Sequence, residues 1–140
     1  TCALVVVKSR QHVIQDQTLE WIDKHFPGIF QEVYFGNHWS LEGISRKKSD
    51  ICRAVGASVL IDDNPMYAVE CAAAGIQVLL YDWDEAYPWS KLKPGQHHQL
   101  IRVVRDWNEV EQLLHVEAQL SLMGTTPQDG AVTGNGMAQH

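Results

Sequence analysis

Short apolar runs rich in β-branched residues recur along the chain, and a segment with helical periodicity or helix-capping residues follows most of them. The first run, residues 3–7, reads Ala-Leu-Val-Val-Val without a polar residue. An unbroken run of this kind is typical of a strand that is covered on both faces, as in a parallel sheet. The alternation therefore predicts an α/β protein: a three-layer, Rossmann-like sandwich around a mostly parallel sheet.

Turn and cap residues divide the chain into the expected elements. Strands are expected at residues 3–7, 32–35, 58–61, 77–81 and 100–104. Helices are expected from about Leu19 to Phe26, from Ser45 or Ser49 to Gly56, from Asn64 to Gly75, and from Asp106 towards Leu120. Residues 1–122 are predicted to form the core, and residues 123–140, rich in Gly, Thr, Gln and Asn, a low-complexity tail.

Composition narrows the class of partner. The chain has 17 acidic and 11 basic residues in 140, and no basic stripe, which argues against nucleic-acid binding through phosphates. Its longest apolar runs have the length of strands, so no membrane-spanning helix is expected. Three cysteines without a C-x-x-C spacing favour reduced thiols and a cytoplasmic location.

The segment after the third expected strand carries the most informative residues, Asp62 and Asp63. Ligands of parallel α/β sheets bind at the carboxyl ends of the strands, and adjacent carboxylates there suit Mg²⁺. The competing interpretation is that Asp63 or Asn64 only caps the next helix while Asp62 is solvated.

Two further residues fit a phosphate site at the same edge. Lys48, 14 positions before Asp62, can bind a phosphoryl oxygen as a point charge, although Lys47 leaves this assignment ambiguous by one residue. The Ser9 hydroxyl, just after the first strand, can donate to a phosphate oxygen. Taken singly, each is also compatible with a solvated lysine or an ordinary turn serine.

These residues together give the chain a family resemblance over roughly residues 4–89. The segments that carry it are Lys-Ser-Arg-Gln at 8–11, His-Phe-Pro-Gly-Ile-Phe at 25–30, Phe-Gly-Asn-His at 35–38, Lys48 with Ser49, and Leu-Ile-Asp-Asp-Asn-Pro at 60–65. They resemble the haloacid dehalogenase-like (HAD-like) phosphohydrolases, in particular the 5′(3′)-deoxyribonucleotidase-like branch. The resemblance implies that the first-strand hydroxyl and the lysine hold phosphate. It also implies that the acidic pair completes a Mg²⁺ site.

The chain departs from the family pattern at two places. Lys8 stands where the family usually has Thr or Ser, so either Ser9 takes that role or a cation occupies the position. The family's nucleophilic Asp-x-Asp motif does not precede the first strand, and Asp82-x-Asp84 has the spacing but follows the wrong strand. The nucleophile strand and the specificity-setting cap are therefore expected to be absent from this chain.

The missing strand has a structural consequence. The sheet order implied by the resemblance leaves a gap between strands 3–7 and 58–61. These strands are predicted to close directly on each other, to borrow a strand from a partner in a homodimer or strand exchange, or to belong to a longer protein.

Two functions follow as hypotheses. The first is the core of a Mg²⁺-dependent phosphatase for a small phosphomonoester, with nucleotides among the candidates, inactive as this chain alone. The alternative is a non-catalytic binding or assembly module, in which Lys8 pairs with Asp62 or Asp63 in place of the metal. A receiver-like phosphoacceptor ranks behind both, because there the lysine follows the acidic pair.

Overall fold

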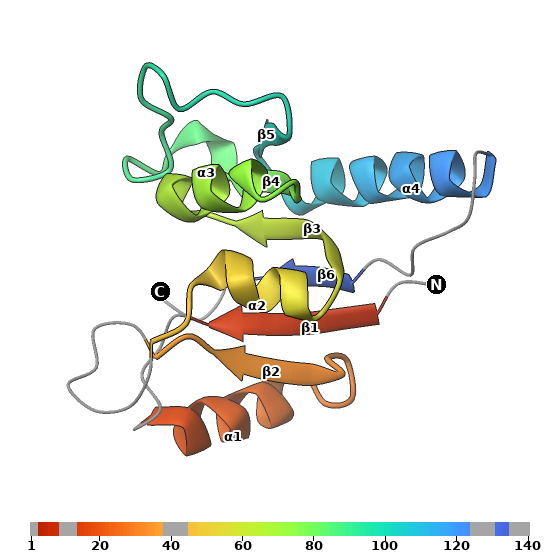
Figure 1. Ribbon diagram of the computed structural model, residues 1–140. Coiled ribbons are helices and arrows are strands. Elements are labelled where there is room, and N and C mark those ends of the chain that lie inside the picture. The colour runs from red at the N-terminus through yellow and green to blue at the C-terminus, as the bar shows by residue number, and fades with distance from the viewer. Residues whose placement is uncertain (1–2, 9–13, 38–44, 124–130, 135–140) are drawn as a thin grey trace.

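One six-stranded sheet organises the computed structural model, which describes residues 3–8, 14–37, 45–123 and 131–134 (Figure 1). The strands are β1 (Ala3–Lys8), β2 (Glu32–Phe35), β3 (Ala57–Asp62), β4 (Gln77–Tyr81), β5 (Ile101–Val104) and β6 (Ala131–Gly134). The helices are α1 (Gln15–His25), α2 (Lys48–Ala54), α3 (Pro65–Ala73) and α4 (Trp107–Met123), with a short 3₁₀ helix, η2 (Trp83–Glu85). The sheet order is β2-β1-β6-β3-β4-β5 and every neighbouring pair is parallel. The predicted alternating α/β architecture with parallel strands is thus confirmed.

Apolar side chains cover both faces of the sheet, as the unbroken apolar strands predict. Along β3, Leu60 packs into a cluster with residues of α2 and α3, such as Ile51 and Ala68. Its neighbours Val59 and Ile61 pack into a second cluster that contains Val110 of α4. Successive side chains of a strand point to opposite faces, so α2 and α3 lie on one face of the sheet and α4 on the other.

The centre of the sheet differs from the prediction. β6 lies between β1 and β3 and pairs with both, Val132 standing opposite Leu4 on one side and Val59 on the other (Figure 1). The expectation that β1 and β3 close directly on each other, or take a strand from a partner, is therefore wrong, because the same chain supplies the strand. No apolar periodicity marks this segment, and its four residues lie in the part of the chain predicted to be a low-complexity tail.

Local capping fixes where α3 begins, directly after the acidic pair. The Asn64 side-chain oxygen accepts a hydrogen bond from the Met66 backbone N–H at 2.9 Å, and Pro65 occupies the first helical position. Both features are typical of a helix N-terminus. Gly75, with φ +86°, follows the last turn in the left-handed conformation that glycine adopts most readily. The helix therefore begins immediately beyond the carboxyl end of β3, and Asn64, not Asp63, is its cap.

Candidate functional site

The carboxyl ends of β1, β3 and β4 bring buried charged residues to one edge of the sheet. Lys8 is the last residue of β1, Asp62 is the last residue of β3, and Asp82 directly follows β4. All of them are buried, as is Lys48 at the start of α2. Charged side chains are rarely buried unless they are paired, so the cluster of buried charges marks this edge as the candidate functional site.

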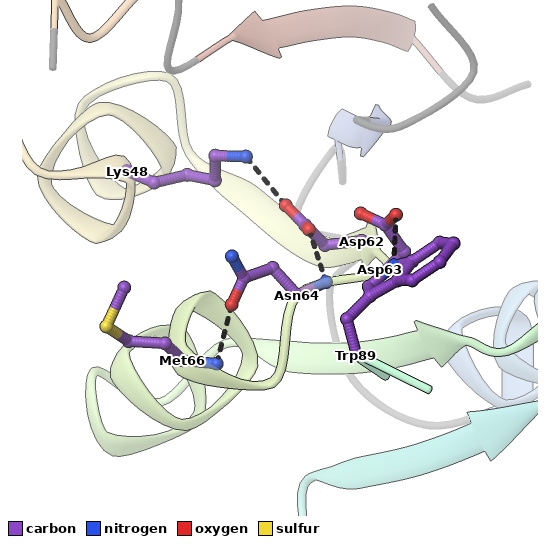
Figure 2. Close-up of polar contacts among 6 residues, drawn as sticks. All are labelled: Lys48, Asp62, Asp63, Asn64, Met66 and Trp89. Atoms are coloured by element: carbon purple, nitrogen blue, oxygen red, sulfur yellow. Dashed lines mark hydrogen bonds and ion pairs between the residues drawn. The ribbon is translucent and has the colours of Figure 1, made fainter. Parts of the chain in front are cut away.

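Lys48 and Asp62 form a buried ion pair at this edge. The Lys48 Nζ lies 2.7 Å from the Asp62 Oδ2, and the two side chains are 1% and 0% exposed (Figure 2). The same ammonium group lies 4.2 Å from the centroid of the Tyr67 ring, a cation–π distance. Lys47, by contrast, is exposed. The ambiguity between the two lysines is therefore resolved in favour of Lys48 as the one that lies beside the acidic pair.

Burial and pairing act on Asp62 in opposite directions. Desolvation by burial raises the pKa of Asp62, and this outweighs the Lys48 charge and the hydrogen bonds from Lys48 and from the Asn64 backbone N–H, which lower it. The Asn64 N–H donates to Oδ1 at 2.9 Å, while Lys48 donates to Oδ2. Both carboxylate oxygens thus accept hydrogen bonds from the protein, so Asp62 is held by α2 on one side and by the start of α3 on the other.

Asp63 is held from the opposite side, by the loop that follows β4. The Trp89 indole N–H donates to the Asp63 Oδ2 at 3.0 Å (Figure 2). The Ser90 hydroxyl donates to the Asp63 carbonyl oxygen. The second carboxylate oxygen, Oδ1, accepts no hydrogen bond from any residue that the structure describes. As far as the described residues go, Asp63 therefore has one oxygen bonded to the protein and one open to a ligand.

Sequence reasoning missed the contact between Trp89 and Asp63. From the sequence alone, the aromatic residues after β4, Trp83, Tyr87 and Trp89, are typical of a loop that fills its own hydrophobic pocket, with stacking on a base as the alternative. Trp89 does stack on Tyr87, with ring centroids 4.5 Å apart and planes at 17°. The available signal was chemical: a tryptophan near buried groups needs an acceptor for its indole N–H, and Asp63 is an acceptor.

The other candidate residues from the sequence are Lys8, Ser9 and the Asp82-x-Asp84 pair. Lys8 is buried at the end of β1, two strand positions from β3, and its carbonyl oxygen accepts the Gly36 N–H at 2.6 Å. Ser9 lies outside the described residues, so its expected phosphate contact remains a prediction. Asp82 is buried, accepts the Tyr87 backbone N–H at 2.9 Å and pairs with Lys91, whereas Asp84 is exposed. The Asp82-x-Asp84 pair thus does not act as a single carboxylate site.

The carboxylate oxygens at this edge are donors of the kind that Mg²⁺ prefers. Within the described ranges no cluster of three His, Cys, Asp or Glu side chains could hold a metal ion on its own. Mg²⁺ does not need such a cluster, since it commonly binds one or two carboxylates and takes water and phosphate oxygens for the rest. The Oδ1 of Asp63, to which no described residue donates, fits this role, whereas both oxygens of Asp62 are bonded to the protein and Lys48 balances its charge.

The fold and this edge define an alternating α/β protein with a parallel sheet and a buried lysine–carboxylate site at the carboxyl ends of its strands. No protein-family model matches the chain, and neither the curated proteins nor the solved structures contain a match. In the described part of the chain, no helix combines the length and apolar character needed to cross a bilayer.

Proposed function

We propose that the chain is the core of a HAD-like, Mg²⁺-dependent phosphatase that binds small phosphomonoesters, nucleotides among them. The observation that carries the proposal is the buried Lys48–Asp62 pair beside Asp63 at the carboxyl edge. Burying an ammonium group is costly, and an apolar pair of similar volume would often be no less stable. A charged pair at the ligand-binding edge of a parallel sheet therefore favours a role in binding over a role in stability.

Each residue has a distinct part in this proposal. Lys48 supplies the positive charge for a phosphoryl oxygen, and Asp62 fixes the ammonium group in position through their 2.7 Å contact. Asp63 offers Oδ1 to Mg²⁺, which would neutralise phosphate charge when bound. Lys8, the last residue of β1, and Ser9, the next residue in the sequence, are the further candidates for contact with phosphate.

Hydrolysis by the resembled mechanism needs an aspartate nucleophile on the central strand. The central strand here is β6, whose sequence is Ala-Val-Thr-Gly, and it carries no carboxylate. We therefore expect the 140-residue chain to bind phosphate and Mg²⁺ without turning over a phosphomonoester. Mg²⁺-dependent hydrolysis of p-nitrophenyl phosphate by the purified chain, abolished in Asp62→Ala, would contradict this expectation.

The binding proposal is tested by isothermal titration calorimetry with Mg²⁺ in the presence of inorganic phosphate. The wild-type chain should bind Mg²⁺, and Asp63→Asn should abolish binding, because it removes the charge of the carboxylate that offers Oδ1. Asp84→Asn is the matched control, since it removes an exposed carboxylate from the loop after β4 and should leave binding unchanged. Equal binding by all three proteins would refute the assignment of Asp63.

A specific observation supports the alternative, a non-catalytic HAD-like binding or assembly module. Both oxygens of Asp62 accept hydrogen bonds and Lys48 already balances its charge, so this carboxylate needs no metal. Lys48 is an internal cation in that reading, and the pairing of Lys8 with Asp62 or Asp63 stays a prediction. Absence of Mg²⁺ binding by the wild-type chain would favour this alternative over the phosphatase core.

A further inference from the structure

The loop between β4 and β5 touches Asp63 at two points. Trp89 donates its indole N–H to the Asp63 Oδ2 at 3.0 Å, and the next residue, Ser90, donates its hydroxyl to the Asp63 carbonyl oxygen. Ser90 is buried, so this second contact is shielded from water. Consecutive residues of one loop thus hold both the side chain and the backbone of the same aspartate.

Trp89 is itself held in place, although 47% of it is exposed. Its ring stacks on Tyr87 at 4.5 Å, and the Tyr87 backbone N–H donates to the buried Asp82 at the end of β4. The indole is therefore linked to the sheet through Tyr87 and Asp82, which restricts the directions in which its N–H can point. An exposed tryptophan held only by packing would not need this orientation.

Trp83 in the same loop provides the comparison. It is 53% exposed, similar to Trp89, but its side chain makes no hydrogen bond or ring contact with a described residue. The two tryptophans thus share their residue type, their loop and their degree of exposure. They differ in the stack on Tyr87, which Trp89→Phe can keep, and in the bond to Asp63, which it removes.

We infer that Trp89 is a positioning residue for Asp63: its indole N–H occupies Oδ2 and directs Oδ1, the remaining oxygen, towards a divalent cation. The inference rests on the proposed function, because it takes Asp63 as the carboxylate that binds Mg²⁺. A carboxylate with one oxygen held by the protein binds a cation through the other oxygen in a fixed orientation. Removing an outer partner of this kind typically lowers metal affinity about 10- to 100-fold.

The test compares Trp89→Phe with the control Trp83→Phe. Phenylalanine keeps a ring that can stack on Tyr87 but has no N–H to donate. In calorimetric titrations with Mg²⁺ and inorganic phosphate, Trp89→Phe should bind Mg²⁺ at least about tenfold more weakly than wild type. Trp83→Phe should bind as wild type does, and circular dichroism should show that both variants are folded.

A spectroscopic measurement on the wild-type chain tests the same inference without a variant, so that misfolding of Trp89→Phe cannot affect the result. Mn²⁺ substituted for Mg²⁺ should broaden the indole N–H resonance of Trp89 in ¹⁵N-labelled protein more strongly than that of Trp83, because the Trp89 N–H donates to the proposed ligand. Equal Mg²⁺ binding by wild type and Trp89→Phe, or equal broadening of the two resonances, would overturn the inference alone. Absence of Mg²⁺ binding by the wild-type chain would overturn the proposed function, and the inference with it.

Discussion

Removing the Lys48 charge should destabilise the fold strongly, because it leaves the Asp62 carboxylate buried without its counter-ion. In Lys48→Met the aliphatic stem is largely kept and the ammonium group is lost. Breaking a buried ion pair at one partner costs about 3–5 kcal/mol. Asp62 retains the hydrogen bond from the Asn64 N–H, so we expect the lower end, about 3 kcal/mol at pH 8. This loss is large beside the 5–15 kcal/mol of a typical domain and corresponds to a decrease in Tm of about 10 °C.

The loss should depend on pH with a definite sign. Burial raises the pKa of Asp62 in the folded protein, and without Lys48 the influence that most opposes this rise is gone. When the folded state holds a carboxyl group at a raised pKa, it binds the proton more tightly than the unfolded state does. Stability then falls as the pH rises above the unfolded carboxyl pKa, about 3.9, and through the folded pKa. Lys48→Met should therefore lose less free energy of unfolding, relative to wild type, at pH 5 than at pH 8.

Urea unfolding followed by circular dichroism at the two pH values measures both effects. The control is the double variant Lys48→Met with Asp62→Asn, which removes both charges and should recover more than half of the loss at pH 8. A cost below about 1 kcal/mol for Lys48→Met at pH 8 would place the pair among exposed ion pairs and refute the reasoning. If the double variant is no more stable than Lys48→Met, the loss of stability comes from altered packing and not from the unpaired charge of Asp62.

Three further predictions concern single positions, each measured as a change in the free energy of urea unfolding. Asn64→Ala removes the cap of α3 and should cost about 1 kcal/mol, and a neutral result would mean that the Met66 N–H finds another acceptor. Thr133→Pro removes a backbone donor from the central strand β6 and should cost about 1–3 kcal/mol, whereas full stability would argue against β6 between β1 and β3. Lys47→Met, next to Lys48 but exposed, should change stability by less than about 0.5 kcal/mol, and a large loss would contradict the assignment of the buried lysine.

The strands that the sequence predicted are those whose apolar patterns are independent of the rest of the chain. The run at residues 3–7 and the run at 77–81 each contain enough apolar, β-forming residues to identify a buried strand, and the structure has strands at both places. β6 could not be predicted in this way. Its four residues gain their strand conformation by pairing with β1 and β3 on both sides, and local sequence does not encode pairing between segments so far apart.

The candidate site was predictable to a similar extent. A lysine 14 positions before an acidic residue can reach it when a short helix leads back into the strand, and Lys48 does contact Asp62. Which of the two aspartates remains open to a ligand was not predictable. That depends on Asn64 and Trp89, one beside the pair in sequence and one 26 positions from Asp63, and therefore on how the loop after β4 folds back over the edge.

The two functions proposed for this edge of the sheet differ in what happens at a single oxygen atom. In the described structure Asp62 is neutralised by Lys48, so the site does not need a metal in order to bury that charge. Any requirement for Mg²⁺ must therefore come from Asp63, where Trp89 holds Oδ2 and no described residue donates to Oδ1. If Oδ1 binds a cation, Lys48 and the cation together make the edge attractive to a phosphate dianion. If it does not, the Lys48–Asp62 pair balances its own charge without a metal, which favours a non-catalytic binding or assembly module.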